Sequence, residues 1–202
     1  MLISKSITTL YIGDIGVYLL DINTITDEDF SLALPQELIT KVQQTFKSSK
    51  RQKEWLGVRL LLKHLFGSNV QIAYKSSGAP FLINSNKHIS ISHSGTLVAI
   101  ALSNEKVGID LQIISDKPLK IKSRFLSNTE IRMMGDQLDA LTAVKLWCAK
   151  EAVYKFLSIP ETPLIGGIML HQNEENIVEQ NHGLNISFKI IDNAVLAIAY
   201  KS

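Results

Sequence analysis

Apolar residues recur at helical spacing in two long stretches of the chain. Over residues 49–66, and again over residues 138–157, they return every three or four positions, which predicts two long helices with one apolar side. Shorter helices are expected where Thr26 can cap a first turn and where Pro35 suits the first turn of the segment PQELITKVQQTF. A further short helix is predicted over residues 128–134.

Other segments show the period of β-strands. Residues 88–92 alternate apolar and polar side chains, and residues 97–103 are apolar throughout, as expected for a central strand. A turn then leads into residues 107–112, and the three runs together predict a meander. Further strands are expected over residues 16–22, 71–76, 186–190 and 194–200, the last two forming a hairpin.

The order of these elements predicts an α+β protein with two similar halves. Each half supplies one long helix and about three strands, although no residue-level repeat relates them. We place the halves at residues 1–103 and 104–202. No low-complexity linker separates them, so we expect them to pack tightly against each other.

Composition narrows the class of protein. The 202 residues are 46% hydrophobic and 20% charged, which is typical of a globular protein. No apolar run reaches the roughly 20 residues that span a bilayer, and the first residues lack the apolar core of a signal peptide. Cys148 is the single cysteine, so an intrachain disulfide is impossible and a cytoplasmic location is predicted. Its place on an apolar stripe favours an inert core cysteine.

Basic residues are concentrated in two places, although the net charge is only +2. Residues 41–63 hold seven lysines and arginines against one acid, Glu54, and residues 117–124 hold four more basic residues. Such clusters are typical of contact with a phosphorylated or acidic partner, and equally of a solvated helix face. The low overall charge and the lack of interleaved aromatic residues argue against nucleic acid.

The segment LWCAKEAVYK carries the densest group of functional side chains. On the predicted helix, Trp147, Lys150, Glu151 and Lys155 lie on one side, because residues three or four apart are neighbours. An exposed Glu151–Lys155 pair would explain this pattern without any function. The alternative is that the charged side of the helix faces a substrate.

Asp110 lies among apolar residues in the segment VGIDLQ. Carboxylates are rarely buried unless they are paired or bind a metal, and the adjacent Gly108 permits a close backbone approach. If the helix packs on this strand, Asp110 and Glu151 can converge, and two carboxylates suit Mg²⁺. A strand-end aspartate that caps a loop is the simpler interpretation for Asp110 alone.

His93 lies between two serines at the end of a predicted strand, followed by Gly95. It can belong to a satisfied polar network, or it can bind a phosphate. The chain has no G-x-S-x-G elbow and no glycine-rich phosphate loop of either standard pattern. Any phosphate must therefore be held by side chains, such as those of Lys50, Arg51 and Arg59, and by strand-end amides.

The segments GAPFL, ISISHSG, VGID and WCAKEAVYK, in this order, resemble the motifs of the 4′-phosphopantetheinyl transferases of the surfactin-synthetase-activating (Sfp-like) type. The resemblance covers about residues 51–155. It implies two α+β halves related by a pseudo-twofold axis, with coenzyme A bound in the cleft between them. It also implies Mg²⁺-dependent transfer of 4′-phosphopantetheine from coenzyme A to a serine of an apo acyl or peptidyl carrier protein, with release of 3′,5′-ADP.

The resemblance also implies roles for individual residues. Asp110 and Glu151 would bind Mg²⁺, with Gln112 at the position where the family has a second acid. Glu151 would act as the base for the carrier serine, and Lys155 would neutralise phosphate charge and protonate the leaving group. The residues implied in binding coenzyme A are Arg51, Arg59, Ser92, His93, Lys150 and Lys155, with Trp147 and Lys150 shaping the helix side of the cleft.

Two departures from the family pattern leave other functions open. Gln112 brings no charge to the metal site, and Ala79 replaces a lysine that could contact coenzyme A. A catalytically weakened module that binds coenzyme A or a carrier protein is therefore an alternative, and a metal-dependent hydrolase of phosphoanhydrides is a third. We expect a monomer, from the length typical of the surfactin type, and docking of the carrier protein on residues 117–124.

Overall fold

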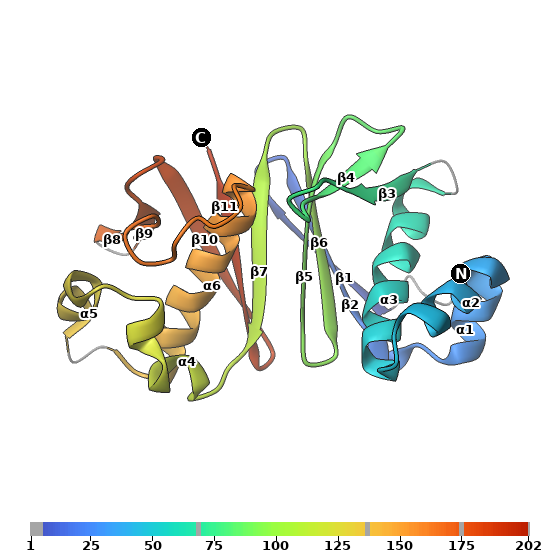
Figure 1. Cartoon of the computed structure of the whole chain (residues 1–202), viewed down its shortest axis with the longest axis horizontal. Coiled ribbons are helices and arrows are strands. Elements are labelled where there is room, and N and C mark those ends of the chain that lie inside the picture. Colours follow the sequence, from blue (N-terminus) through green and yellow to red (C-terminus); the bar gives the residue numbers. More distant parts are fainter. Residues whose placement is uncertain (1–5, 68–69, 136–137, 174–175, 202) are drawn as a thin grey trace. The chain divides into compact units, whose positions relative to one another are not determined.

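The computed structural model describes residues 6–67, 70–135, 138–173 and 176–201. The chain divides into two compact units, Met1–Lys75 with Pro80–Asn104 and Ser76–Ala79 with Glu105–Ser202. Each unit packs helices against an antiparallel sheet (Figure 1), which confirms the predicted α+β class. The pseudo-twofold axis and the division at residue 103 stay predictions.

The first unit combines a four-stranded sheet, a two-stranded hairpin and four helical segments. Its strands are β1 (Ile7–Ile12), β2 (Ile15–Asp21), β3 (Gln71–Tyr74), β4 (Pro80–Ile83), β5 (His88–Ser94) and β6 (Leu97–Ser103). Its helices are η2 (Ile22–Thr24), α1 (Asp27–Ala33), α2 (Gln36–Thr45) and α3 (Ser49–Phe66). The sheet has the order β1-β2-β6-β5, and β3 pairs with β4. The apolar side chains of β2, β6 and α3 form the core of this unit.

Side-chain caps determine where the helices of the first unit begin and end. The Thr26 hydroxyl accepts a hydrogen bond from the Asp29 N–H at 3.1 Å, and the Asp29 carboxylate accepts one from the Thr26 N–H at 2.8 Å. At the start of α3, the Ser48 hydroxyl accepts a hydrogen bond from the Arg51 N–H. The helix ends at Gly67 with φ 68°, a conformation that favours glycine. These boundaries agree with the predicted helices.

The second unit contains a five-stranded antiparallel sheet with the order β7-β11-β10-β9-β8. Its strands are β7 (Val107–Ile113), β8 (Leu170–Asn173), β9 (Asn176–Glu179), β10 (Leu184–Ile191) and β11 (Ala194–Tyr200). Its helices are α4 (Lys117–Lys120), η3 (Lys122–Arg124), α5 (Asn128–Met134) and α6 (Ala140–Leu157). The long helix α6 packs on β7 and β11, and its apolar residues form a second core with β10 and β11.

Gly108 brings α6 into direct backbone contact with β7. A Cβ atom at this position would lie 2.0 Å from the carbonyl oxygen of Ala152 and 2.6 Å from the backbone nitrogen of Phe156. Atoms cannot approach so closely, so only glycine allows the strand and the helix to lie at this separation. Because side chains alternate along a strand, Asp110 leaves β7 on the same face as position 108, toward α6.

The predicted meander of residues 88–112 is wrong. β5 and β6 do form a hairpin, but the second edge of β6 pairs with β2, from Gly16↔Leu102 to Asp21↔Leu97. With both edges of β6 occupied, no hydrogen-bonding edge remains for β7. β7 pairs with β11 instead, and the two strands belong to the sheet of the second unit.

Four observed strands carry no clear sequence signal. β1 is partly exposed along its whole length, so its apolar residues do not alternate cleanly. β4 follows the turn SSGAP and begins at Pro80, a residue that is rare inside strands. β8 and β9 have only four residues each, which is too short for a period to be recognised. The C-terminal hairpin of β10 and β11 is confirmed.

The described residues contain no helix that combines the length and the apolar character required to cross a membrane.

We expect Gly108→Ala to destabilise the protein by about 1–3 kcal/mol, because α6 must move away from β7 to make room for the methyl group. Urea unfolding measures the loss. Gly16→Ala is the matched control, since the three atoms nearest to an added Cβ there all belong to the side chain of Tyr18, which can move. If the two variants had equal free energies of unfolding, the close backbone contact between Gly108 and α6 would not determine where the helix lies.

Candidate functional site

A charged cluster in the second unit forms where α6 lies on β7. Asp110 is only 3% exposed, and its Oδ1 accepts a hydrogen bond from the ammonium of Lys155 at 2.7 Å. Its Oδ2 accepts a hydrogen bond from the side-chain amide of Gln112 at 2.9 Å. The buried carboxylate is thus paired, as a charge inside a protein must be. Lys155 therefore pairs with Asp110, a residue 45 positions away in the sequence. The exposed Glu151–Lys155 pair that the sequence left open is not the ion pair seen in the structure.

Glu151 lies beside this pair in an environment that disfavours its charge. Burial is the main cause that raises the pKa of the Glu151 carboxyl above its ordinary value, and the neighbouring Asp110 carboxylate raises it further. The Lys155 ammonium opposes both effects. A carboxylate whose pKa is raised toward neutrality accepts a proton more readily, which is the property required of a general base.

Cys148 belongs to the core, as expected. It is fully buried, and its thiol donates a hydrogen bond to the carbonyl oxygen of Val195 at 3.4 Å. Burial raises the pKa of the Cys148 thiol well above its ordinary value, and the nearby Asp110 carboxylate adds to the effect. A thiol in this state is a poor nucleophile.

The donor set at the site fits a magnesium ion. Among the described residues, no group of three or more His, Cys, Asp and Glu side chains is arranged so that it could hold a metal ion. However, Mg²⁺ is usually held by one or two carboxylates together with water and substrate phosphates, and Asp110 and Glu151 supply two. Gln112 now turns its NH₂ group toward Asp110, so its amide must rotate before its oxygen can act as a ligand. The assignment of Asp110, Glu151 and Gln112 to a metal stays a prediction.

A second charged cluster lies in the first unit, on α3 and β5. Arg51 Nη1 lies 3.1 Å from Glu54 Oε2 and 2.5 Å from His93 Nε2, and His93 Nδ1 lies 3.4 Å from Glu54 Oε1. One tautomer of His93 satisfies both contacts, with Nδ1–H donating to Glu54 and Nε2 accepting from Arg51. The structure therefore brings Arg51 and His93 together, and their binding of a phosphate stays a prediction.

Glu54 organises this cluster, and the sequence analysis did not give it a role. The Glu54 side chain is 8% exposed, and Lys50 Nζ lies 3.9 Å from Glu54 Oε1, the oxygen that also faces His93. The available signal was its spacing, three residues after Arg51 and four after Lys50, which places all three on one helix face.

Arg59 contacts other residues of its own unit. Its guanidinium stacks on the Trp55 ring, 3.2 Å from the ring centre, and donates hydrogen bonds to the Trp55 carbonyl and the Tyr74 hydroxyl. Burial lowers the pKa of Arg59 below its ordinary value. These contacts fix the guanidinium on the Trp55 ring, and the coenzyme A contact of Arg59 stays a prediction. Ser92 is buried next to His93 on β5.

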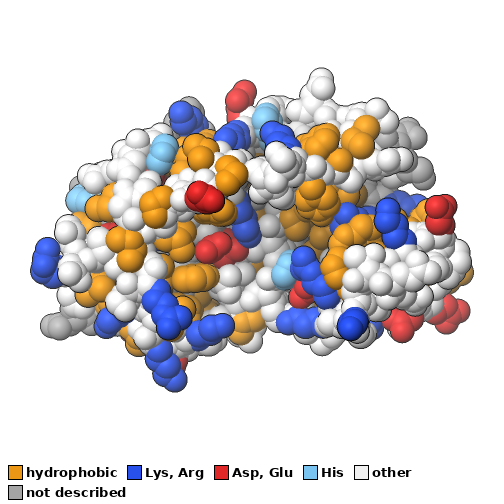
Figure 2. Space-filling view, viewed as in Figure 1, with side chains coloured by type: hydrophobic (Ala, Val, Ile, Leu, Met, Phe, Trp, Pro, Cys, Tyr) orange, Lys and Arg blue, Asp and Glu red, His pale blue; other side chains and the backbone are white. Residues whose placement is uncertain are grey.

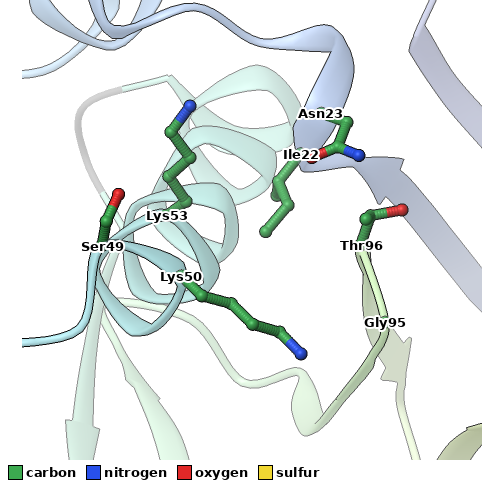
Figure 3. Close-up of a pocket in the computed structure, with 7 residues that line it drawn as sticks. All are labelled: Ile22, Asn23, Ser49, Lys50, Lys53, Gly95 and Thr96. Atoms are coloured by element: carbon green, nitrogen blue, oxygen red, sulfur yellow. The ribbon is translucent and has the colours of Figure 1, made fainter.

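A pocket of about 500 Å³ opens beside the same helix (Figure 3). Its polar lining includes Lys50 and Lys53, and Lys50 extends toward the turn that contains Gly95 and Thr96. The pocket shares Lys50 with the Glu54 cluster. Both features add positive charge to one end of α3, which suits a phosphorylated ligand.

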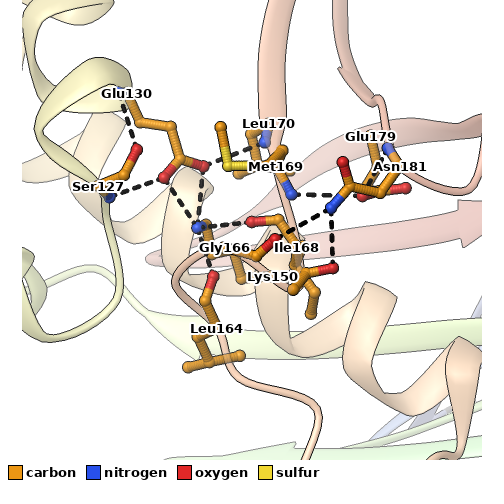
Figure 4. Close-up of polar contacts among 11 residues, drawn as sticks. Ser127, Glu130, Lys150, Leu164, Gly166, Ile168, Met169, Leu170, Glu179 and Asn181 are labelled. Carbon is orange, nitrogen blue, oxygen red and sulfur yellow. Dashed lines mark hydrogen bonds and ion pairs between the residues drawn. The ribbon is translucent and has the colours of Figure 1, made fainter.

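Lys150 does not face a ligand, which corrects its assignment to coenzyme A binding. Its side chain is 0% exposed, and its ammonium lies 2.8 Å from the equally buried Glu130 carboxylate (Figure 4). Burial lowers the pKa of Lys150, and Glu130 opposes this change. Trp147 also packs inward, edge-on against Phe125 with ring centres 4.9 Å apart. Only Glu151 and Lys155 of the predicted helix face contribute to the charged cluster around Asp110.

The segment from α4 to η3 carries the second basic stretch on its surface. Figure 2 shows lysine and arginine side chains gathered over this end of the second unit. Lys117, Lys120 and Arg124 are exposed, and Lys122 is half-buried. The group is therefore available for contact with an acidic partner.

Comparison with known proteins agrees with the motifs. Residues 106–192 match the family model of the 4′-phosphopantetheinyl transferase superfamily. The chain is 30% identical over 109 residues to 4′-phosphopantetheinyl transferase gsp of Aneurinibacillus migulanus, covering 50% of this chain and 46% of the relative. It is 29% identical over 120 residues to 4′-phosphopantetheinyl transferase Sfp of Bacillus subtilis, and this match covers 55% of this chain and 53% of the relative. Residues 106–192 are therefore similar to the 4′-phosphopantetheinyl transferase superfamily, and the chain spans about half the length of the curated relatives it matches.

We expect two substitutions to move the pKa of Glu151 in opposite directions. Asp110→Asn removes a repelling charge and lowers this pKa, whereas Lys155→Met removes an attracting charge and raises it. Titration of the glutamate carboxyl carbons by NMR measures both shifts. Shifts of the same sign would contradict the arrangement described for the three side chains.

The stability of Glu151→Gln should show the same environment. With a raised pKa, ionisation of Glu151 costs the folded state more than the unfolded chain. The free energy of unfolding therefore falls as the pH rises from the ordinary carboxyl pKa through the raised one. Glu151→Gln is expected to remove this fall and to be at least as stable as the parent at neutral pH. Urea unfolding across the mildly acidic to neutral range tests this, and a less stable variant at neutral pH would contradict it.

Proposed function

We propose that the protein transfers the 4′-phosphopantetheine group of coenzyme A to a serine of an apo acyl or peptidyl carrier protein. The observation that carries this proposal is the cluster of Asp110, Lys155 and Glu151, which lies within the segment that matches the family model. Gsp and Sfp, which the chain resembles, are named as 4′-phosphopantetheinyl transferases.

In the proposed reaction, the serine oxygen attacks the phosphorus that carries the pantetheine. A new serine–phosphate bond forms, the pyrophosphate bond breaks, and 3′,5′-ADP leaves with the bridging oxygen. Glu151 accepts the serine proton, a task for which its raised pKa suits it. Lys155, held 2.7 Å from Asp110, places a positive charge where the leaving phosphate gains negative charge.

Magnesium would be held by Asp110 and Glu151, with the Gln112 amide as a third donor. When bound, it supplies positive charge to the pyrophosphate oxygens, which is the main requirement of phosphoryl transfer. The protein's own residues position the reacting groups and take up the serine proton. No covalent intermediate with the protein is needed.

In the first unit, we assign phosphate binding to Arg51 and His93, supported by the basic pocket lined by Lys50 and Lys53. The carrier protein is proposed to dock on the exposed basic residues of α4 and η3, because opposite charges favour and orient association. Action as a monomer, and a cytoplasmic location, are part of the same proposal.

The decisive experiment incubates the protein with coenzyme A, Mg²⁺ and a panel of apo carrier proteins, and follows their mass. Addition of one 4′-phosphopantetheine per carrier supports the proposal. Binding of coenzyme A without transfer to any carrier would favour the binding-module alternative, in which Gln112 leaves the metal site too weak. Cleavage of coenzyme A without an acceptor would favour the hydrolase.

Glu151→Gln is expected to lower the transfer rate by about 10²–10⁴-fold, because the serine proton loses its acceptor. Initial rates from the mass assay measure the loss. Glu105→Gln, which changes an exposed glutamate of the same unit, is the control and should keep the parent rate. A near-normal rate for Glu151→Gln would remove Glu151 from its assigned role.

Gln112→Glu should lower the Mg²⁺ concentration needed for half-maximal transfer, because a third carboxylate adds negative charge beside Asp110. A magnesium titration of the transfer rate measures the effect. Gln71→Glu adds the same charge at an exposed position of β3 and serves as the control. An unchanged or higher magnesium requirement in Gln112→Glu would place the metal elsewhere.

A further inference from the structure

The buried pair of Lys150 and Glu130 has no task in the proposed chemistry. The Lys150 ammonium lies 2.8 Å from Glu130 Oε1 and 3.0 Å from Oε2. It also donates hydrogen bonds to the carbonyl oxygens of Leu164 at 2.6 Å and Ile168 at 2.9 Å (Figure 4). A lysine ammonium has three hydrogens, and these acceptors occupy all of them.

Glu130 connects this pair to two further elements. Its Oε2 accepts a hydrogen bond from the Ser127 N–H at 2.7 Å, which forms the capping box at the start of α5. Its Oε1 accepts a hydrogen bond from the Leu170 N–H at 3.0 Å, at the start of β8. A single ion pair therefore joins α5, α6, β8 and the segment of residues 164–168.

Stability alone is a poor explanation for such a pair. Removing two charges from water is costly, and well-packed apolar side chains of similar volume are often as stabilising as a buried ion pair. An ion pair with several directed hydrogen bonds differs from apolar packing in one respect, because it allows only one orientation of the groups that it joins. The pair therefore specifies the position of α6 more than it strengthens the fold.

We propose that Glu130 and Lys150 are positioning residues for Glu151. Lys150 and Glu151 are consecutive on α6, so their side chains leave the helix about 100° apart. The Glu130 pair holds one side of the helix, and the backbone contact at Gly108 holds another. The edge-on contact of Trp147 with Phe125 adds an attachment one turn earlier. Together these contacts leave α6 little freedom to rotate or slide, and so set where the Glu151 carboxylate lies relative to Asp110.

This inference rests on the proposed function, and a stability-matched control separates positioning from folding. Glu130→Gln keeps the size of the side chain but removes the charge that holds Lys150. Glu179→Gln alters a carboxylate that is nearly as buried, accepts hydrogen bonds from the backbone N–H groups of Met169, Asn181 and His182, and pairs with the His182 ring. Its charge acts on Lys150 from a distance, but none of the hydrogen bonds seen among the described residues joins it to α6. Lys150→Gln removes the same pair from its other side, so the result does not depend on one variant folding.

All variants are assayed well below their melting temperatures, with coenzyme A and an apo carrier protein. We expect kcat to fall 10- to 100-fold in Glu130→Gln and Lys150→Gln, with little change in the KM for coenzyme A. Glu179→Gln should lose stability but keep the parent kcat. A parent-like kcat in both variants of the pair, when folded, would overturn the proposal and leave the pair a structural feature only.

Binding of Mn²⁺ as a probe of the metal site gives a readout that needs no turnover. We expect Mn²⁺ to bind 10- to 100-fold more weakly to Glu130→Gln, and with the parent affinity to Glu179→Gln. The parent protein could show no transfer while Mn²⁺ still binds more weakly to Glu130→Gln and unchanged to Glu179→Gln. In that case the proposed function fails and the positioning role stands. If the parent is active and both readouts are unchanged in the pair variants, the positioning role fails alone. A parent that neither transfers nor binds Mn²⁺ would overturn both.

Discussion

The backbone contact between Gly108 and α6 determines the geometry of the charged cluster in the second unit. At this point the strand approaches the carbonyl of Ala152 so closely that no side chain fits between them. Asp110, two residues further along the same face of β7, is thereby brought within reach of a helix that begins 30 residues later in the sequence. Its pairing with Lys155 and its influence on Glu151 follow from this approach. A larger residue at position 108 would separate these groups even if each of them were retained.

The charges of α6 are arranged unequally. Lys150 and Lys155, the two lysines of the motif, each have a buried carboxylate partner, Glu130 and Asp110 respectively. Among the ion pairs seen in the described part of the chain, none includes Glu151, which lies between them in sequence. Burial and the neighbouring Asp110 carboxylate raise the pKa of the Glu151 carboxyl above its ordinary value, so this group takes up a proton more readily than an exposed glutamate does. The motif on this helix thus combines two lysines that have buried partners with one carboxyl group that is outside the ion pairs described.

The sequence predicted those parts of the fold that have a long period or a single dominant pattern. The boundaries of α3, α5 and β6 agree with the predictions, because caps and apolar runs define them locally. The meander was wrong because strand pairing depends on which edges are occupied, and adjacency in the sequence does not reveal that β6 already pairs with β2. The short strands β8 and β9 have too few residues for any pattern.

For the site, the motifs named three side chains that the structure brings together, Asp110, Glu151 and Lys155, but they gave the wrong environment for Lys150. Helical spacing placed Lys150 on the same side as Glu151, yet a difference of one position is a rotation large enough to turn it into the core. The segment Ser127-Asn128-Thr129-Glu130 was readable as a capping box, but nothing local shows that its glutamate also binds a lysine of another helix.

The hydrogen bond from Gln112 to Asp110 has a consequence for how the chain reaches its folded state. With Lys155 on one oxygen of Asp110 and a neutral amide on the other, the charge of this carboxylate already has a cationic partner within the protein. A glutamate at position 112 would leave an additional negative charge beside Asp110, which only a cation could offset. The amide therefore lets β7 and α6 assemble without a cation at this place, and under the proposed function it would separate the folding of this unit from the binding of magnesium.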